Sequence, residues 1–166
     1  MVPEDRDSDY VMTARPFGWT LSGAGWAVVA VRLSAQQAAL EMNASYFHDS
    51  LRDTATAILA LDNGAKEARI VLMDEPGEHH IIVRRVDHQS LDIEVRWYEE
   101  WRSWGVGSEA FVNVASGRVR WKTFRGAVIS ALQDLLREHG VEGYRSEWVK
   151  HDFPADELRR LEVGVG

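Results

Sequence analysis

The clearest pattern of hydrophobic positions lies between Thr123 and Gly140. Apolar side chains recur there at intervals of three and four residues and charged side chains fall on the opposite side, which is typical of an amphipathic helix. Thr123 is suited to cap the start of this helix, and Gly140 can adopt the left-handed conformation that ends one. A second helical pattern follows a capping residue at Ser45 and ends near Gly64. The sequence therefore predicts two main amphipathic helices.

Apolar runs outside these helices predict strands. The alternation from Leu91 to Tyr98 places apolar residues, Trp97 included, on a buried face and charged residues on a wet one. A small terminal helix begun by Pro154 is expected over 154–161. The strands are expected over residues 17–22, 26–33, 40–43, 69–73, 80–86 and 91–98, and as a hairpin of 110–114 with 118–122. These elements predict an α+β fold, with a mostly antiparallel sheet of about seven or eight strands, two main amphipathic helices and a short C-terminal helix.

The length and composition fit one ordinary domain. The chain has 166 residues, of which 45% are hydrophobic and 27% charged, as in an average globular protein. Residues 1–16 have no periodicity, so we expect a flexible acidic N-terminal arm followed by a single α+β domain over 17–166. The chain has no cysteine, which excludes disulfides, thiolate zinc sites and a cysteine nucleophile.

The net charge limits the class of partner. The formal charge is −7, whereas a nucleic-acid-binding domain is normally basic, so the charge disfavours nucleic-acid binding. An acidic chain suits a basic protein partner, although a solvated surface without any partner would have the same balance. The acidic N-terminus is unlike a secretory signal and no apolar run is long enough to cross a bilayer, so we expect a cytoplasmic protein without membrane contact.

Aromatic residues gather between Trp97 and Gly107. Tyr98, Trp101 and Trp104 lie where the strand expected over 91–98 gives way to a glycine-rich loop. On a loop they can form a contact surface for a partner or a stacking wall for a ligand. The alternative is that they close one end of the core, as large apolar residues in a monomeric domain usually do.

A second candidate is the basic run of Arg118, Arg120 and Lys122. These residues alternate with apolar ones, so they project from one face of a strand and are suited to receive a carboxylate or a phosphate. The alternative needs no ligand, because Asp92, Glu94 or Glu109 on neighbouring strands can pair with them.

Histidines give only weak candidates for chemistry. His79 and His80 are adjacent in a strand and therefore point to opposite faces, which makes shared metal binding difficult. His48 lies near Asp53 at a possible helix start, and His151 lies near the C-terminus. The sequence contains no HExxH, phosphate-loop or nucleophile-elbow motif, so we expect no catalytic residue, no metal and no cofactor.

Several short elements, in this order along the chain, resemble those of small actinobacterial α+β hypothetical proteins. They are Gly25-Trp26-Ala27, Ser45-Tyr46-Phe47, Asp74-Glu75-Pro76-Gly77-Glu78, Gly143-Tyr144 and Trp148-Val149-Lys150-His151-Asp152-Phe153-Pro154. The similarity covers most of the chain from about residue 17. These proteins have no established activity, so the resemblance assigns no functional residues. Some are similar in size and acidity to immunity proteins.

Two hypotheses of function follow. The first is a non-catalytic protein-binding domain, for example one with an immunity or antitoxin-like role against a basic toxin. The second is a small-molecule-binding protein or hydrolytic enzyme, with a site near the Trp101/Trp104 loop and the Arg118/Arg120 strand. Binding of single-stranded nucleic acid by aromatic and basic residues is chemically possible, but the net charge disfavours it.

Overall fold

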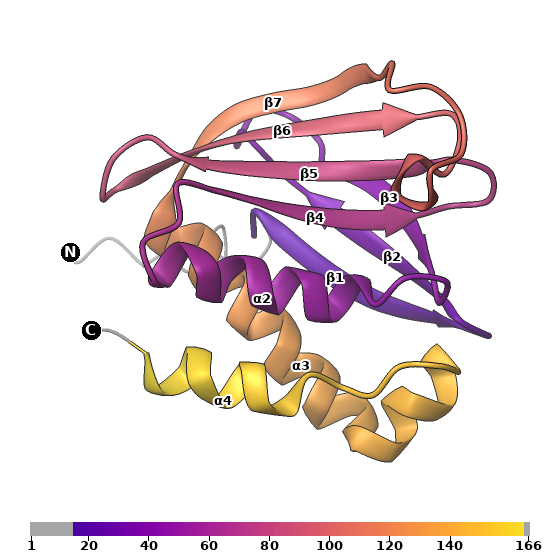
Figure 1. Cartoon of the computed structure of the whole chain (residues 1–166). Coiled ribbons are helices and arrows are strands. Elements are labelled where there is room, and N and C mark those ends of the chain that lie inside the picture. The colour runs from indigo at the N-terminus through magenta and orange to yellow at the C-terminus, as the bar shows by residue number, and fades with distance from the viewer. Residues whose placement is uncertain (1–14, 165–166) are drawn as a thin grey trace.

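A computed structural model describes residues 15–164 and shows an α+β domain (Figure 1). The predicted fold class is confirmed, with antiparallel strands, two main helices and a short C-terminal helix. The strands are β1 (Phe17–Gly23), β2 (Trp26–Val31), β3 (Leu40–Ser45), β4 (Glu67–Met73), β5 (Glu78–Arg85), β6 (Ser90–Tyr98) and β7 (Val112–Arg120). The helices are α2 (Ser50–Asp62), α3 (Trp121–Trp148), α4 (Ala155–Val163) and the short 3₁₀ helix η1 (Arg102–Trp104).

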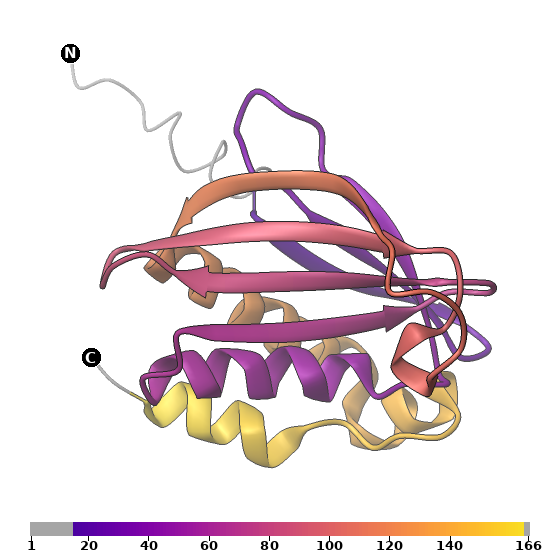
Figure 2. The same ribbon diagram turned by 45° about the horizontal axis from the view of Figure 1, so that its top comes forward.

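The strands form two sheets rather than the single sheet expected. One has the order β1-β2-β3 and the other β4-β5-β6-β7, and every neighbouring pair is antiparallel. Helix α2 connects the two sheets and packs along β4, whereas α3 packs on β1 (Figures 1 and 2). Strand β7 ends the order of the second sheet and lies along the upper border of the molecule in Figure 1. It is therefore an edge strand.

The core lies between the helices and the inner faces of the two sheets. The apolar stripe predicted for α3 is buried, with Phe124, Val128 and Leu132 at zero exposure. Helix α2 contributes Leu51 and Ile58, which are also fully buried. Each such side chain stabilises the fold by about 1.5–3 kcal/mol when it leaves water. Both amphipathic patterns thus mark real core faces.

The helix ends differ from the predicted ones. Asp49 rather than Ser45 is the N-cap of α2, and its carboxylate accepts a hydrogen bond from the backbone N–H of Arg52. Thr123 is not the cap of α3, which begins at Trp121 with Arg120 as its N-cap. Gly140 has the positive φ that was predicted for it, 67°, but a further helical piece follows it as far as Trp148. A glycine that permits a left-handed residue can end a helix or kink it, and the sequence does not distinguish these outcomes.

The hairpin predicted over 110–122 is wrong, because one continuous strand, β7, runs through the expected turn. Gly117 lies in the middle of this strand and pairs with Ile93 of β6. A β-carbon at Gly117 would lie only 2.9 Å from the β-carbon of Leu33, so the glycine serves close packing rather than a turn. A bulge leaves Val114 as an extra residue between the partners of Val95 and Arg96.

The N-terminal arm expected over 1–16 lies outside the described residues apart from its last two. Of these, Arg15 donates to the carboxylate of Asp134 on α3 at 3.2 Å. Between residues 15 and 164, no helix has both the length and the apolar character that spanning a membrane requires.

Candidate protein-interaction surface

The end of β6 has an aromatic residue on each face of its sheet. Trp97 shares the inner face with Val95 but is only partly buried, and it packs on the His79 ring at a centroid distance of 4.6 Å. Tyr98 points to the outer face and is 3% exposed. The expectation that Trp97 is core is therefore wrong. The core ends before Trp97 is reached, while the chain that follows β6 folds back over Tyr98 and places Phe111 at 5.6 Å from its ring.

A polar cluster of two buried residues on β5 and the exposed Ser103 fixes this returning chain to the sheet. Glu78 and His80 of β5 are almost inaccessible to water, and Glu78 Oε1 lies 2.8 Å from His80 Nε2. The same oxygen accepts the backbone N–H and the hydroxyl of Ser103, which belongs to η1. Burial alone would raise the pKa of Glu78, but the hydrogen bonds from His80 and Ser103 bring its pKa below the ordinary value. We call Glu78, His80 and Ser103 the Ser103 latch.

The Ser103 latch contains the residue types of a hydrolytic triad but not the geometry. A triad needs the serine and the carboxylate on opposite nitrogens of the imidazole. Here Ser103 Oγ and Glu78 Oε1 both approach His80 Nε2, and His80 Nδ1 is buried without a hydrogen-bond partner within the described structure. The arrangement suits a structural tie rather than proton transfer.

The two candidate tryptophans next to the latch have different roles. Trp101 is partly buried, and its ring N–H donates to the backbone carbonyl of Asp74 at 2.8 Å. Its ring contacts those of Phe47 and Trp104, at centroid distances of 5.5 and 5.2 Å. Trp104 is 51% exposed. Trp101 thus anchors the loop, and Trp104 is presented to solvent.

Exposed apolar side chains concentrate between residues 104 and 114, which we call the apolar segment. Within residues 15–164, nine large hydrophobic residues are exposed, and five of them belong to this segment. Isolated exposed apolar residues are normal on a protein surface, whereas a concentration of them calls for a cause. The five are Trp104, Val106, Phe111, Val112 and Val114.

The apolar segment borders a small hollow of about 350 Å³. Its walls combine aromatic and aliphatic surface with two exposed carboxylates, Glu99 and Glu100. The lining residues are Trp97, Glu99, Glu100, Ser108, Ala110, Phe111 and Val112. Because Val112 also begins β7, the hollow adjoins the open edge of the sheet.

Arg118 and Arg120 of the basic run lie at the other end of β7, whereas Lys122 belongs to α3, so the prediction that all three project from one face of a strand is wrong. Arg118 donates to both carboxylate oxygens of Asp92, at 2.7 and 3.1 Å, which is the cross-strand alternative considered from the sequence. Arg120 and Lys122 are exposed, and no ion pair joins them to any other residue of the described chain. Arg120 pairs with Ser90 at the start of β6, so the basic run and the tryptophan loop lie at opposite ends of the sheet.

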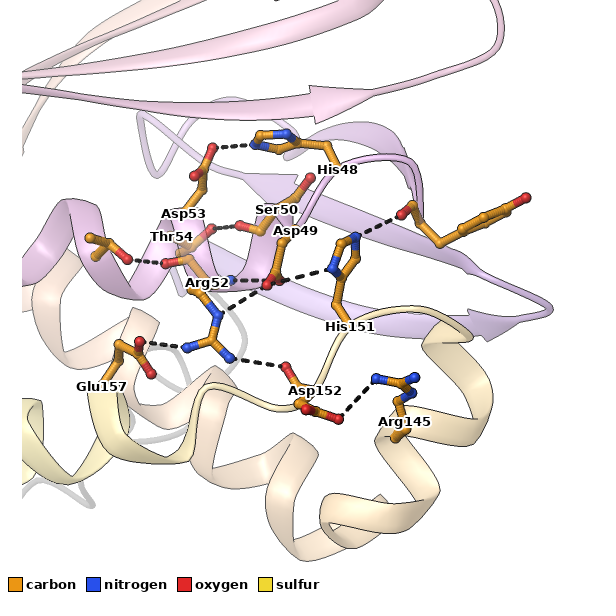
Figure 3. Close-up of polar contacts among 12 residues, drawn as sticks. His48, Asp49, Ser50, Arg52, Asp53, Thr54, Arg145, His151, Asp152 and Glu157 are labelled. Carbon is orange, nitrogen blue, oxygen red and sulfur yellow. Dashed lines mark hydrogen bonds and ion pairs between the residues drawn. The ribbon is translucent and has the colours of Figure 1, made fainter.

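Two of the histidine candidates, His48 and His151, belong to a polar network that surrounds the start of α2 (Figure 3). His48 Nε2 lies 2.6 Å from the carboxylate of Asp53, and this hydrogen bond raises the pKa of His48. His151 Nε2 instead lies 2.9 Å from the backbone carbonyl of Tyr46, while its other ring nitrogen faces Asp49 at 3.8 Å. Both imidazoles are thus held by partners within the chain.

Arg52 connects this network to the C-terminal part of the chain. Its guanidinium binds Asp49 at 3.0 Å and Glu157 of α4 at 2.5 Å, and it reaches the backbone carbonyl of Asp152 (Figure 3). The Asp152 carboxylate binds Arg145. Among residues 15–164, no group of three or more histidine, aspartate or glutamate side chains is placed to hold a metal ion. The network joins α4 to α2.

Comparisons with known proteins give no family. The chain has no match among protein-family models, curated proteins or solved structures.

Proposed function

We propose that this protein is a non-catalytic domain that binds another protein through the apolar segment and the adjoining edge of β7. The observation that carries the proposal is the concentration of five exposed apolar side chains between residues 104 and 114. Aromatic residues such as Trp104 and Phe111 are enriched at interfaces and often dominate binding energy. An edge strand adds unpaired backbone N–H and C=O groups to such a surface.

Charge supports a basic partner. Glu99 and Glu100 line the hollow beside the apolar segment, whereas the nearby Glu109 is already paired with Arg102 at 2.8 Å. The whole chain has a formal charge of −7. Opposite charges on two proteins steer their encounter and disfavour wrong partners. An immunity or antitoxin-like role against a basic toxin is the concrete form of the proposal.

The alternative, a small-molecule site or hydrolytic enzyme, has weaker support. It needs Trp101 and Trp104 to act together with Arg118 and Arg120, and these pairs lie at opposite ends of the sheet. Arg118 is already bound to a carboxylate. The buried His80 is engaged through Nε2 and its Nδ1 has no access to a substrate.

Capture from a lysate of the native host tests the proposal. The full chain is immobilised beside a Val112→Asp variant, which places a charge in the apolar segment, and a Val163→Asp variant, which does the same at an 87% exposed site on α4. We expect a protein retained by the wild type and by Val163→Asp but lost with Val112→Asp. If nothing is retained, or if both variants retain the same proteins as the wild type, the proposal fails.

A further inference from the structure

The geometry points to strand addition as the way the partner binds. The partner supplies an extended segment that pairs with residues 112–115 of β7 and places a lysine or arginine side chain in the hollow beside Glu99 and Glu100. This inference rests on the proposed function and names the chemistry of the partner.

The backbone of β7 supplies the first element of this site. Strand β7 pairs with β6 on one side, and no strand of the described chain pairs with its other side. Half of its N–H and C=O groups therefore point away from the sheet and can accept another strand. Side chains set the position of that strand, since Val112 and Val114 are exposed and apolar at one end while Arg118 and Arg120 are exposed at the other. The charge of Arg118 is paired with Asp92, but Arg120 has no ion pair within the described residues and repels a basic segment, which is therefore favoured at the valines.

The hollow supplies the second element. Its volume of about 350 Å³ is at the lower limit of ligand pockets, which suits a single side chain better than a large ligand. Trp97 and Val112 offer apolar surface for the methylene stem of a lysine or arginine, and Glu99 and Glu100 offer oxygens for its charged end. The ring of Phe111 is already covered by the guanidinium of Arg96 at 4.2 Å, and Arg96 is itself paired with Glu94, so the carboxylates of Glu99 and Glu100 rather than this ring receive the incoming cation.

Overall charge argues against a second copy of this chain as the occupant. Each of two copies would carry a formal charge of −7. Repulsion between like net charges disfavours their association. A basic segment from another protein meets no such repulsion.

Two matched peptides test the inference directly. The uniformly ¹⁵N-labelled full chain is titrated with the acetylated, amidated peptide Val-Lys-Val-Arg-Val and with Val-Glu-Val-Glu-Val, and backbone amide signals are followed by NMR. We expect saturable shifts at residues 112–115 with the basic peptide and none with the acidic one. A Glu99→Gln/Glu100→Gln variant is expected to bind the basic peptide about tenfold more weakly, because charge-assisted hydrogen bonds are lost. A Glu138→Gln/Glu142→Gln variant changes the net charge equally on exposed α3 positions and is expected to bind as the wild type does.

Three results would overturn the inference. They are equal binding of the two peptides, shifts centred away from β7 or absent, and a wild-type dimer in sedimentation velocity that Val112→Asp dissociates. The proposed function would still stand after any of these results if the wild type, but not Val112→Asp, captures a host protein. Failure of the strand-addition inference can therefore be distinguished from failure of the proposed function.

Discussion

A single carboxylate oxygen of Glu78 accepts both the backbone N–H and the hydroxyl of Ser103, at 2.8 and 2.9 Å. Glu78 has no exposed surface, and it lies on β5, whereas Ser103 lies on η1. Because Trp101 immediately precedes η1 and Trp104 ends it, these two bonds also set how both rings are presented. The contact surface therefore depends on a buried polar tie beneath it.

We expect Ser103→Ala to lower the free energy of unfolding by about 1 kcal/mol, since one hydrogen bond is lost while the backbone bond remains. Glu78→Ala should cost more, about 2–4 kcal/mol, because it leaves the buried His80 and the N–H of Ser103 without their acceptor. Urea unfolding measures both. Glu75→Gln, on the exposed turn before β5, is the control and should change stability by less than about 0.5 kcal/mol. Equal effects of the three variants would contradict the latch.

Tryptophan fluorescence separates the anchor from the presented ring. Trp104→Phe should remove a readily quenched component from the acrylamide titration at little cost in stability, because Trp104 is 51% exposed. Trp101→Phe should instead lower the free energy of unfolding by about 1 kcal/mol, since the hydrogen bond to the Asp74 carbonyl is lost. If Trp101→Phe removes the quenched component and Trp104→Phe destabilises the fold, the assignment of the two rings is reversed.

The spacing of apolar residues correctly predicted the helices and strands that bury one face along their whole length. The stripe of α3 and the alternation of β6 as far as Val95 are of this kind. The pattern failed at Trp97, because its burial depends on where the opposing core ends rather than on its own periodicity. The sequence pattern also gave a wrong prediction at Gly117. Glycine is typical of turns, but it is equally required where the backbone closely approaches another residue, here Leu33.

The candidate site was only partly predictable. The sequence identified the tryptophan loop, but Glu78 and Ser103 are 25 positions apart and no local spacing indicates their contact. The sequence pattern predicts a paired hairpin for Val112 and Val114, and only the strand order shows that their strand has an open edge. Topology, rather than residue type, decides whether such valines are buried or exposed.

The Arg52 network predicts a local role in holding α4. Arg52→Ala should lower the free energy of unfolding by only about 1–2 kcal/mol, because the guanidinium is partly exposed and water screens its ion pairs. The larger effect should be faster amide hydrogen exchange in α4, which loses its tie from Glu157 to α2. Arg145→Ala, which breaks a more exposed pair with Asp152, is the control and should leave the exchange of α4 nearly unchanged. Equal protection of α4 in Arg52→Ala and the wild type would show that apolar packing alone holds this helix.

His79 predicts a defined loss of stability in weak acid. Burial against Trp97 lowers the pKa of His79 to about 4, whereas an unfolded histidine has a pKa of about 6.5. Between these values the unfolded chain binds a proton that the folded chain does not, so stability falls as the pH decreases from about 6.5 towards 4 and this contribution levels off below it. Partial exposure of the ring reduces the effect to about 1–3 kcal/mol.

Unfolding of a His79→Leu variant in urea across this pH range isolates that contribution. The variant should show a shallower decrease in stability than the wild type, while His88→Gln, at an exposed turn, should follow the wild type. The ring protons of His79 should titrate in NMR near the lowered pKa. If His79 instead titrates with the ordinary pKa, Trp97 leaves the His79 ring open to water. The packing of Trp97 on His79 and Gly77 would then enclose the inner side of the hollow less than the structure indicates.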